Sequence, residues 1–209
     1  MPKPKYAIAV LISGGGSNFI AIHKAIQNGL FDGEIVFVLS STEKAGGLKY
    51  ATENEIPHFT PTADVFMSEQ KFANYLLEKT TDYNVQLVVL AGFLKKIPAA
   101  FISDFSGKII NIHPALLPSF GGKGMYGRHV HQAVLDYGCK ISGATVHLVN
   151  SGYDTGPPII QKSVQVFVDD TPEILAQRVL KIEHEILPQA VAAFAEDKVI
   201  INGRKIYIG

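Results

Sequence analysis

Hydrophobic and polar positions follow a repeating pattern over the first half of the chain. Continuous apolar runs, typical of strands buried on both faces, alternate with segments of helical periodicity. This alternation indicates a parallel sheet covered by helices on both faces. We therefore predict the α/β class, with an open, mostly parallel twisted sheet of the Rossmann-like type. The predicted strands are 6–12, 34–39, 86–91 and 108–112, with a short extended piece near 58–60, and the predicted helices are 18–28, 45–55 and 68–80.

The pattern changes after residue 140. Two strands with more polar alternation, 144–149 and 159–166, are separated only by a turn-rich segment. That segment is too short for a crossover helix, so the two strands should be antiparallel. A long helix should follow, because Thr171 suits the N-cap position and Pro172 the first helical position, and Asn202-Gly203 predicts a terminal hairpin. The sequence shows no repeat, linker or low-complexity tract, so we expect residues 1–209 to form a single domain.

Composition narrows the class of protein. The chain is 47% hydrophobic and 18% charged, and its 19 basic residues equal its 19 Asp and Glu residues. A balanced charge argues against nucleic acid as the main partner, whereas a small phosphorylated ligand needs only one local site. The single Cys139 excludes an internal disulfide and favours a reducing compartment. The apolar run 6–13 is too short to span a bilayer, so we expect a cytoplasmic protein without membrane association.

A glycine-rich segment, SGGGSN at 13–18, joins the first predicted strand to the first predicted helix. Glycines let the backbone approach a ligand closely, and a helix N-terminus offers N–H groups and partial positive charge to a phosphate. The dinucleotide fingerprint is met only in part, because Phe19 stands where its third glycine belongs and no acidic residue ends the strand 34–39. A monophosphate site is therefore favoured over a dinucleotide site. A tight strand-to-helix turn without a ligand is the plainer alternative.

The segment NIHPALLP at 111–118 follows an apolar strand run. Asn111 and His113 are two residues apart, so both should project from the same face of the strand end, and Pro114 stops the hydrogen-bond ladder. Active sites of open α/β sheets lie beyond the carboxyl ends of strands. An amide donor beside an imidazole suits the stabilisation of an oxyanion in acyl transfer. The alternative is a histidine that merely caps a strand before a proline turn.

Asp154 lies in the turn between the two antiparallel strands, in the sequence DTGPP. An aspartate is common in turns, and this is its plain structural explanation. The functional hypothesis places its carboxylate beside His113, where a nearby anion favours the imidazolium and raises the pKa of His113.

In this order, the glycine-rich segment, the NIHPALLP segment and the Asp154 turn closely resemble the phosphoribosylglycinamide formyltransferase (GAR transformylase) family of folate-dependent enzymes. The resemblance runs from about residue 6 to residue 195 and includes the strand region 88–93 and Glu183-His184 in the last predicted helix. The NxHPxLLP segment is similar to a signature that all formyltetrahydrofolate-dependent formyltransferases share. The glycine-rich segment with Ser17-Asn18 is similar to the ribonucleotide-type enzymes in particular.

This resemblance implies transfer of a formyl group from 10-formyltetrahydrofolate, a co-substrate used without a metal, to the amine of glycinamide ribonucleotide in purine synthesis. The amine would attack the formyl carbon directly, without a covalent enzyme intermediate. Asn111 and protonated His113 would stabilise the charge on the formyl oxygen, and Asp154 would hold His113 charged and oriented. The resemblance further assigns the phosphate to Gly15, Gly16, Ser17 and Asn18, the ribose hydroxyls to Glu183, and the folate to Asn111 and to the backbone of Leu94, Lys95, Lys96 and Ile97.

Several of these residues have plainer explanations. Lys95 and Lys96 also suit a solvated loop, and Glu183 suits an exposed helix face. His129-x-His131 resembles a pair of metal ligands, but no third ligand lies at a suitable spacing, and packing or polar roles are favoured, so we expect no metal site.

Two features depart from the family pattern. Glu69 stands where some members carry a basic residue that meets the folate tail, with Lys71 close by, and the glycine-rich segment 121–128 is longer than in the shortest members. That segment either closes over the ribonucleotide or is a surface loop. The competing functions are formyl transfer to a nucleotide-sugar amine and non-catalytic binding of a sugar phosphate. We expect small-molecule partners only, and a monomer or homodimer.

Overall fold

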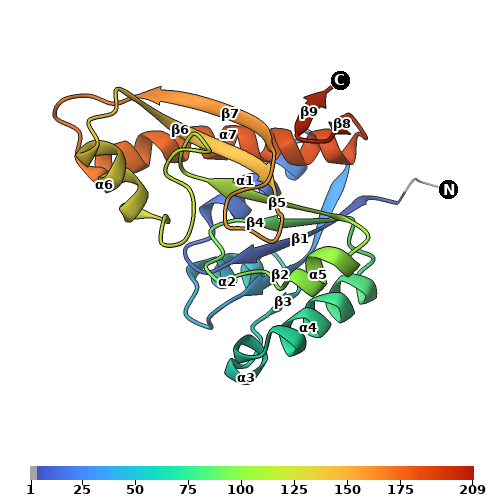
Figure 1. Ribbon diagram of the computed structural model, residues 1–209. Helices are drawn as coiled ribbons and strands as arrows, with labels where there is room; N and C mark the ends of the chain where they lie inside the picture. The colour runs from blue at the N-terminus through green and yellow to red at the C-terminus, as the bar shows by residue number, and fades with distance from the viewer. Residues whose placement is uncertain (1–3) are drawn as a thin grey trace. The chain divides into compact units, whose positions relative to one another are not determined.

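The computed structural model describes residues 4–209 (Figure 1). The chain forms two compact units, the first ending at Ile110 and the second running from Asn111 to Gly209. Strand β5, Lys108–His113, begins in the first unit and ends in the second. The expectation of a single domain stays a prediction.

The first unit contains a parallel sheet in the strand order β3-β2-β1-β4, with the beginning of β5 next to β4. Strand β1 pairs in parallel with both β2 and β4, and β2 pairs in parallel with β3. Residues Ile8–Ile12 of β1 are completely buried, as a central strand covered on both faces requires. The strands are β1 Tyr6–Ile12, β2 Gly33–Ser40, β3 His58–Phe59 and β4 Leu87–Leu90.

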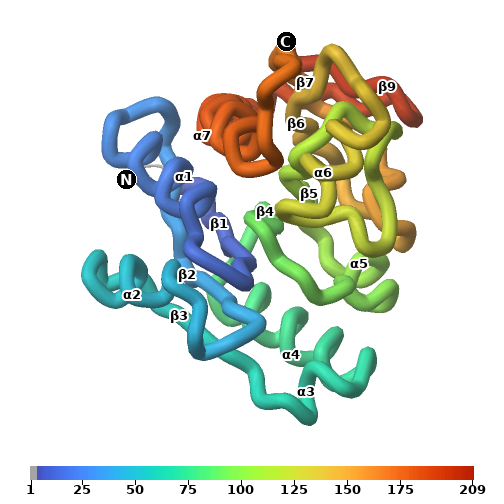
Figure 2. The backbone as a smooth tube through the Cα atoms, turned by 90° about the vertical axis from the view of Figure 1, so that its left-hand side faces the viewer, coloured from blue at the N-terminus to red at the C-terminus, as the bar shows by residue number. Residues whose placement is uncertain are grey.

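Helices cover both faces of this sheet, with α1 and α2 on one face and α4 and α5 on the other (Figure 2). Helix α4 begins as its sequence predicts, because the Ser68 hydroxyl accepts a hydrogen bond from the N–H of Lys71. Two short helices, α3 and α5, were not predicted, because one or two turns carry too little periodicity to be recognised. The helices are α1 Ser17–Gln27, α2 Gly46–Glu53, α3 Ala63–Met67, α4 Glu69–Asp82 and α5 Ala99–Asp104.

The second unit is built on antiparallel strands. Strand β6, Ile141–Leu148, lies between the end of β5 and β7, Pro158–Gln165, and it is antiparallel to β7 as predicted. Helix α7, Pro172–Ala195, packs against β6 and β7 and starts with the predicted Thr171 cap. Helix α6, Arg128–Asp136, which was not predicted, packs against α7.

The predicted terminal hairpin is formed by β8, Val199–Asn202, and β9, Lys205–Ile208. The predicted fold class is confirmed: an open, mostly parallel sheet with helices, and antiparallel strands in the C-terminal part. Within residues 4–209, none of the helices combines the length and apolar character needed to cross a membrane.

Candidate active site

The glycine-rich segment is open to solvent at its tip and tight at its base. Gly14 and Gly15 are exposed, and a Cβ atom added to either would meet nothing within 4 Å. Gly16 is buried at the N-cap of α1 with a φ of 75°, and a Cβ there would lie 2.8 Å from the Cα of Gly47. A glycine cap offers no side chain to the first N–H groups of α1, so the helix N-terminus is suited to an anion. Ser17 is exposed beside it.

A hydroxyl connects this segment to the loop after β4. Ser13 Oγ accepts a hydrogen bond from Ser41 Oγ at 2.6 Å and another from the backbone N–H of Leu94 at 2.9 Å. The carboxyl ends of β1, β2 and β4 meet at one edge of the sheet, which brings the three segments together. The predicted phosphate loop and the predicted folate loop are thus linked within the first unit. Of the predicted folate residues, Leu94, Lys95 and Lys96 are exposed and Ile97 is buried.

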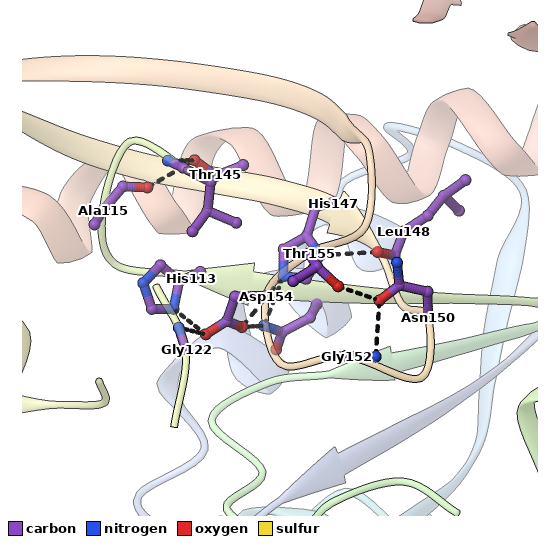
Figure 3. A network of polar contacts seen from close by, with 12 residues as sticks. His113, Ala115, Gly122, Thr145, His147, Leu148, Asn150, Gly152, Asp154 and Thr155 are labelled. Atoms are coloured by element: carbon purple, nitrogen blue, oxygen red, sulfur yellow. Dashed lines mark hydrogen bonds and ion pairs between the residues drawn. The ribbon is translucent and has the colours of Figure 1, made fainter. Parts of the chain in front are cut away.

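The structure brings together the three predicted catalytic side chains in the second unit. Asn111 and His113 come from the same face of β5, and Asp154 comes from the β6–β7 loop. His113 Nδ1 lies 3.6 Å from Asp154 Oδ2, and Asn111 Nδ2 lies 3.5 Å from Asp154 Oδ1. Figure 3 shows the carboxylate of Asp154 directed toward His113.

The backbone after β5 contacts the other side of this group. His113 Nε2 lies 2.8 Å from the carbonyl oxygen of Phe120, and the N–H of Gly122 donates to Asp154 Oδ2 at 2.9 Å. Because a carbonyl can only accept, Nε2 carries a hydrogen. Both nitrogens of His113 therefore face acceptors, and only the imidazolium can donate to both.

Burial nevertheless decides the direction of the His113 pKa. The side chain is 4% exposed, and this burial lowers its pKa below the ordinary value. Asp154 and the Phe120 carbonyl raise the pKa, and the nearby His147 lowers it further. Our prediction that Asp154 leaves His113 with a raised pKa is therefore wrong in its net direction. The predicted effect of Asp154 itself is present, but loss of hydration outweighs it.

Asp154 is held as an anion by its surroundings. Burial raises its pKa, but the contact with His147, the N–H of Gly122 and the charge of His113 together lower the pKa below its ordinary value. Its backbone has a φ of 53°, in the left-handed region that non-glycine residues seldom adopt. A residue in this conformation is kept there by its contacts.

His147, near the end of β6, is a member of the group that was not predicted from the sequence. Its Nδ1 lies 2.8 Å from the carbonyl of Leu148, so Nδ1 carries the hydrogen. Its Nε2 lies 3.0 Å from Asn111 Nδ2 and 3.6 Å from Asp154 Oδ1. This contact orients the amide of Asn111. The available signal was the period of two in β6, which places His147 on the same face as the buried Thr145.

Other predicted residues have clear positions. Glu183 is 8% exposed within α7, so the alternative of an exposed helix face is wrong. On α6, His129 is exposed and His131 is buried, and residues two apart on a helix point to different sides. These two histidines therefore do not form a ligand pair. Among residues 4–209, no group of three or more His, Cys, Asp or Glu side chains is placed to hold a metal ion.

The two departures from the family pattern lie in different settings. Glu69 is the first residue of α4, where a negative charge is favourable, and Lys71 pairs with Asp64 at 3.0 Å on the surface. The segment 121–128 contributes Gly122 to the Asp154 carboxylate, and its last residue, Arg128, begins α6. The segment is therefore more than a surface loop, because its backbone contacts the site.

Comparison with known proteins identifies the family. The formyl transferase family matches residues 6–191 of this chain. The chain belongs to the formyl transferase family. It is 36% identical over 192 residues to the phosphoribosylglycinamide formyltransferase of Escherichia coli, covering 92% of this chain and 88% of that protein. The crystal structure of glycinamide ribonucleotide transformylase 1 from Symbiobacterium toebii matches with a TM-score of 0.91 and 36% identity, over 98% of this chain and 94% of that one.

Plant relatives are longer than this chain. The chain is 44% identical over 193 residues to the chloroplastic phosphoribosylglycinamide formyltransferase of Arabidopsis thaliana, covering 92% of its own length and 66% of that protein. It covers 62% of the corresponding protein of Vigna unguiculata. The chain therefore spans slightly less than two thirds of the plant relatives it matches.

Proposed function

We propose that this chain transfers the formyl group of 10-formyltetrahydrofolate to the amine of 5'-phosphoribosylglycinamide, a step of purine biosynthesis. The observation that carries the proposal is the convergence of Asn111, His113 and Asp154 in a formyl transferase family member. The names of its relatives support this choice of acceptor. Folate is a co-substrate in this reaction, and the residues of the site supply its acid–base groups.

The reaction forms one bond and breaks another. The acceptor amine attacks the formyl carbon, a C–N bond forms, and the carbonyl oxygen takes up negative charge. Asn111 Nδ2 stabilises this oxyanion by donating a hydrogen bond, which as a preorganised donor contributes about 10²–10³ in rate, and protonated His113 stabilises it by its positive charge. The bond from the formyl carbon to N10 then breaks, the amine loses a proton, and N10 gains one. Asp154 stabilises the imidazolium throughout.

Substrate binding is assigned to other groups. In this proposal Gly15, Gly16, Ser17 and Asn18 bind the phosphate at the N-terminus of α1, and Glu183 binds the ribose hydroxyls. The backbone of residues 94–97 binds the folate ring, with Asn111 near the formyl group. The link through Ser13 supports a role for both loops of the first unit, because it ties the position of one loop to the other.

A formyl-transfer assay tests the proposal. Purified protein is given 10-formyltetrahydrofolate with glycinamide ribonucleotide, with a nucleotide-sugar amine, or with no acceptor, and products are identified by mass spectrometry. We expect a formylated ribonucleotide that His113→Ala protein makes far more slowly. Formylation of the nucleotide sugar alone would favour the first alternative, and binding of the ribonucleotide without any transfer would favour a non-catalytic binder. A cytoplasmic location and a monomeric or homodimeric state stay predictions.

A further inference from the structure

The terminal hairpin formed by β8 and β9 lies beyond residue 191, where the family match ends. It belongs to the second unit, where β9 packs against β7 (Figure 2). Its base is held by a hydrogen bond from the N–H of Gly209 to the carbonyl of Lys198 at 3.0 Å. Its tip is the two-residue turn Gly203-Arg204, in which Gly203 has a φ of 58°.

Arg204 reaches from this turn to the loop that carries Asp154. Its Nη1 donates to the backbone carbonyl of Thr155 at 3.1 Å. The bound carbonyl belongs to the Thr155–Gly156 peptide, and one further peptide, Asp154–Thr155, separates it from Asp154. A guanidinium at this carbonyl therefore restrains the loop immediately after Asp154.

The rest of the loop is restrained from within. Asn150 Oδ1 accepts from the N–H of Gly152 at 3.2 Å and from the hydroxyl of Thr155 at 2.7 Å (Figure 3). At the base of the loop, the N–H of Leu148 donates to the carbonyl of Pro157 at 3.0 Å. Arg204 adds a contact from a separate element. A residue with the backbone conformation of Asp154 needs such contacts, because that conformation is intrinsically unfavourable.

We propose that the hairpin at 199–208 is a working part of the active site, in which Arg204 positions the Asp154 carboxylate against His113 by holding the Thr155 carbonyl. The inference deepens the proposed function and rests on it. Arg204 acts through Asp154 and is a positioning residue. It makes the C-terminal hairpin a determinant of turnover, although the hairpin lies outside the family match.

Displacement of Asp154 has a specific consequence for His113. Asp154 raises the pKa of His113 against the effect of burial, so a carboxylate that moves away leaves that pKa lower still. The other groups that face His113 are the Phe120 carbonyl, His147 on β6 and His131 on α6. None of these lies on the hairpin, so a response of His113 to a change at Arg204 reports on the Asp154 loop.

The test compares Arg204→Ala and Arg204→Lys with Lys205→Ala, a neighbouring exposed position on the same hairpin. The measurements are an NMR titration of His113 without substrates, kcat and KM for both substrates, and the melting temperature. One net hydrogen bond of about 1 kcal/mol corresponds to a factor of about five. We expect about fivefold lower kcat, little change in either KM, and a lower His113 pKa for Arg204→Ala, with Arg204→Lys between it and wild type.

Two outcomes would overturn the inference: an unchanged His113 titration in folded Arg204→Ala protein, or equal changes in Lys205→Ala. In an Asp154→Asn background, Arg204→Ala should add no further loss of kcat, because its target charge is gone. The titration needs no substrate, so failure of the proposed function is distinguishable. A protein that transfers no formyl group but shows the His113 response would contradict the function and keep the positioning role.

Discussion

Two opposing effects act on the pKa of His113. Its ring nitrogens face the Phe120 carbonyl and the Asp154 carboxylate, which favour the cation, yet the side chain is almost fully removed from water. Burial prevails, and the pKa lies below its ordinary value. Because the pKa is lowered, His113 is neutral in most molecules at neutral pH. The charged form is a minority state, and Asp154 increases its population.

Replacing Asp154 by Asn should lower the His113 pKa further. The carboxylate raises this pKa, so its removal leaves burial less opposed, and at any given pH less of the ring is protonated. Activity should therefore fall most at the alkaline end of the range. An NMR titration of His113 paired with a pH–rate profile checks this, with Asp169→Asn, an exposed position, as the charge-matched control. An unchanged pKa with lost activity would leave Asp154 a positioning or water-binding role.

Removing either oxyanion donor should reduce kcat more than it changes either KM. We expect Asn111→Ala and His113→Ala each to lower kcat by about 10²–10³, because their interactions strengthen as charge develops on the formyl oxygen. Steady-state kinetics and melting temperatures together give the answer. Near-normal kcat in a folded variant would remove that residue from the mechanism.

The positions of individual residues were predicted correctly where they depend on a single strand or turn. Asn111 and His113 share a strand face by the period of two, and the structure confirms that placement. His147 was missed because its contact with Asn111, 36 residues away in the sequence, depends on β5 and β6 being neighbours in the sheet. The predicted direction of the His113 pKa shift was wrong, because the sequence indicates which charged residue is close but not how far the side chain is buried from water.

At the scale of elements, buried strands and long helices were predicted well. Apolar runs with turn residues at both ends located β1, β2, β4 and β5, and the Thr171-Pro172 pair located the start of α7. The short helices α3 and α5 were missed, because tertiary packing rather than periodicity stabilises so few turns. Helix α6 was missed although its nine residues are amphipathic. Helix α6 is the consequential case, since it buries His131 in the second unit.

The glycine-rich segment between β1 and α1 is the proposed phosphate site, and a substitution there can test it. A change at Gly16 would strain the backbone and meet Gly47, so it would not isolate phosphate binding. Ser17→Ala is a more specific test, because Ser17 is exposed and its hydroxyl is free of the backbone strain that a change at Gly16 would cause. A hydrogen bond to a charged group is worth about 1.5 kcal/mol or more, so the ribonucleotide KM should rise about tenfold.

The folate KM and the melting temperature should stay close to wild type in Ser17→Ala protein. Ser163→Ala, an exposed serine on β7, serves as the control. Initial rates measured against each substrate in turn separate the two constants. Equal weakening of both substrates would argue against a dedicated phosphate site at the N-terminus of α1.

For the whole molecule, histidines that are fully or partly buried make stability depend on acid. His23, His113 and His131 all have pKa values lowered, in each case chiefly by burial. The unfolded chain, with ordinary pKa values near 6.5, therefore binds protons at a higher pH than the folded chain does. Stability consequently falls as pH decreases from about 6.5 toward the folded pKa values. Asp154 adds a loss at still lower pH, because its pKa is lowered in the fold.

Because unfolding takes up protons in this range, urea unfolding midpoints should decline between pH 7 and pH 5, and His131→Gln should make the decline shallower. His131 is 4% exposed and its Nδ1 finds no hydrogen-bond partner within the described chain, so its protonation is poorly accommodated there. If unfolding takes up one proton fewer, the free energy of unfolding changes less with pH, by at most about 1.4 kcal/mol per pH unit. The exposed His129→Gln should leave the slope unchanged.

A midpoint independent of pH over this range, or equal slopes in the two variants, would show that burial of His131 does not control acid stability. The same curves test the single-domain prediction, which requires one cooperative transition.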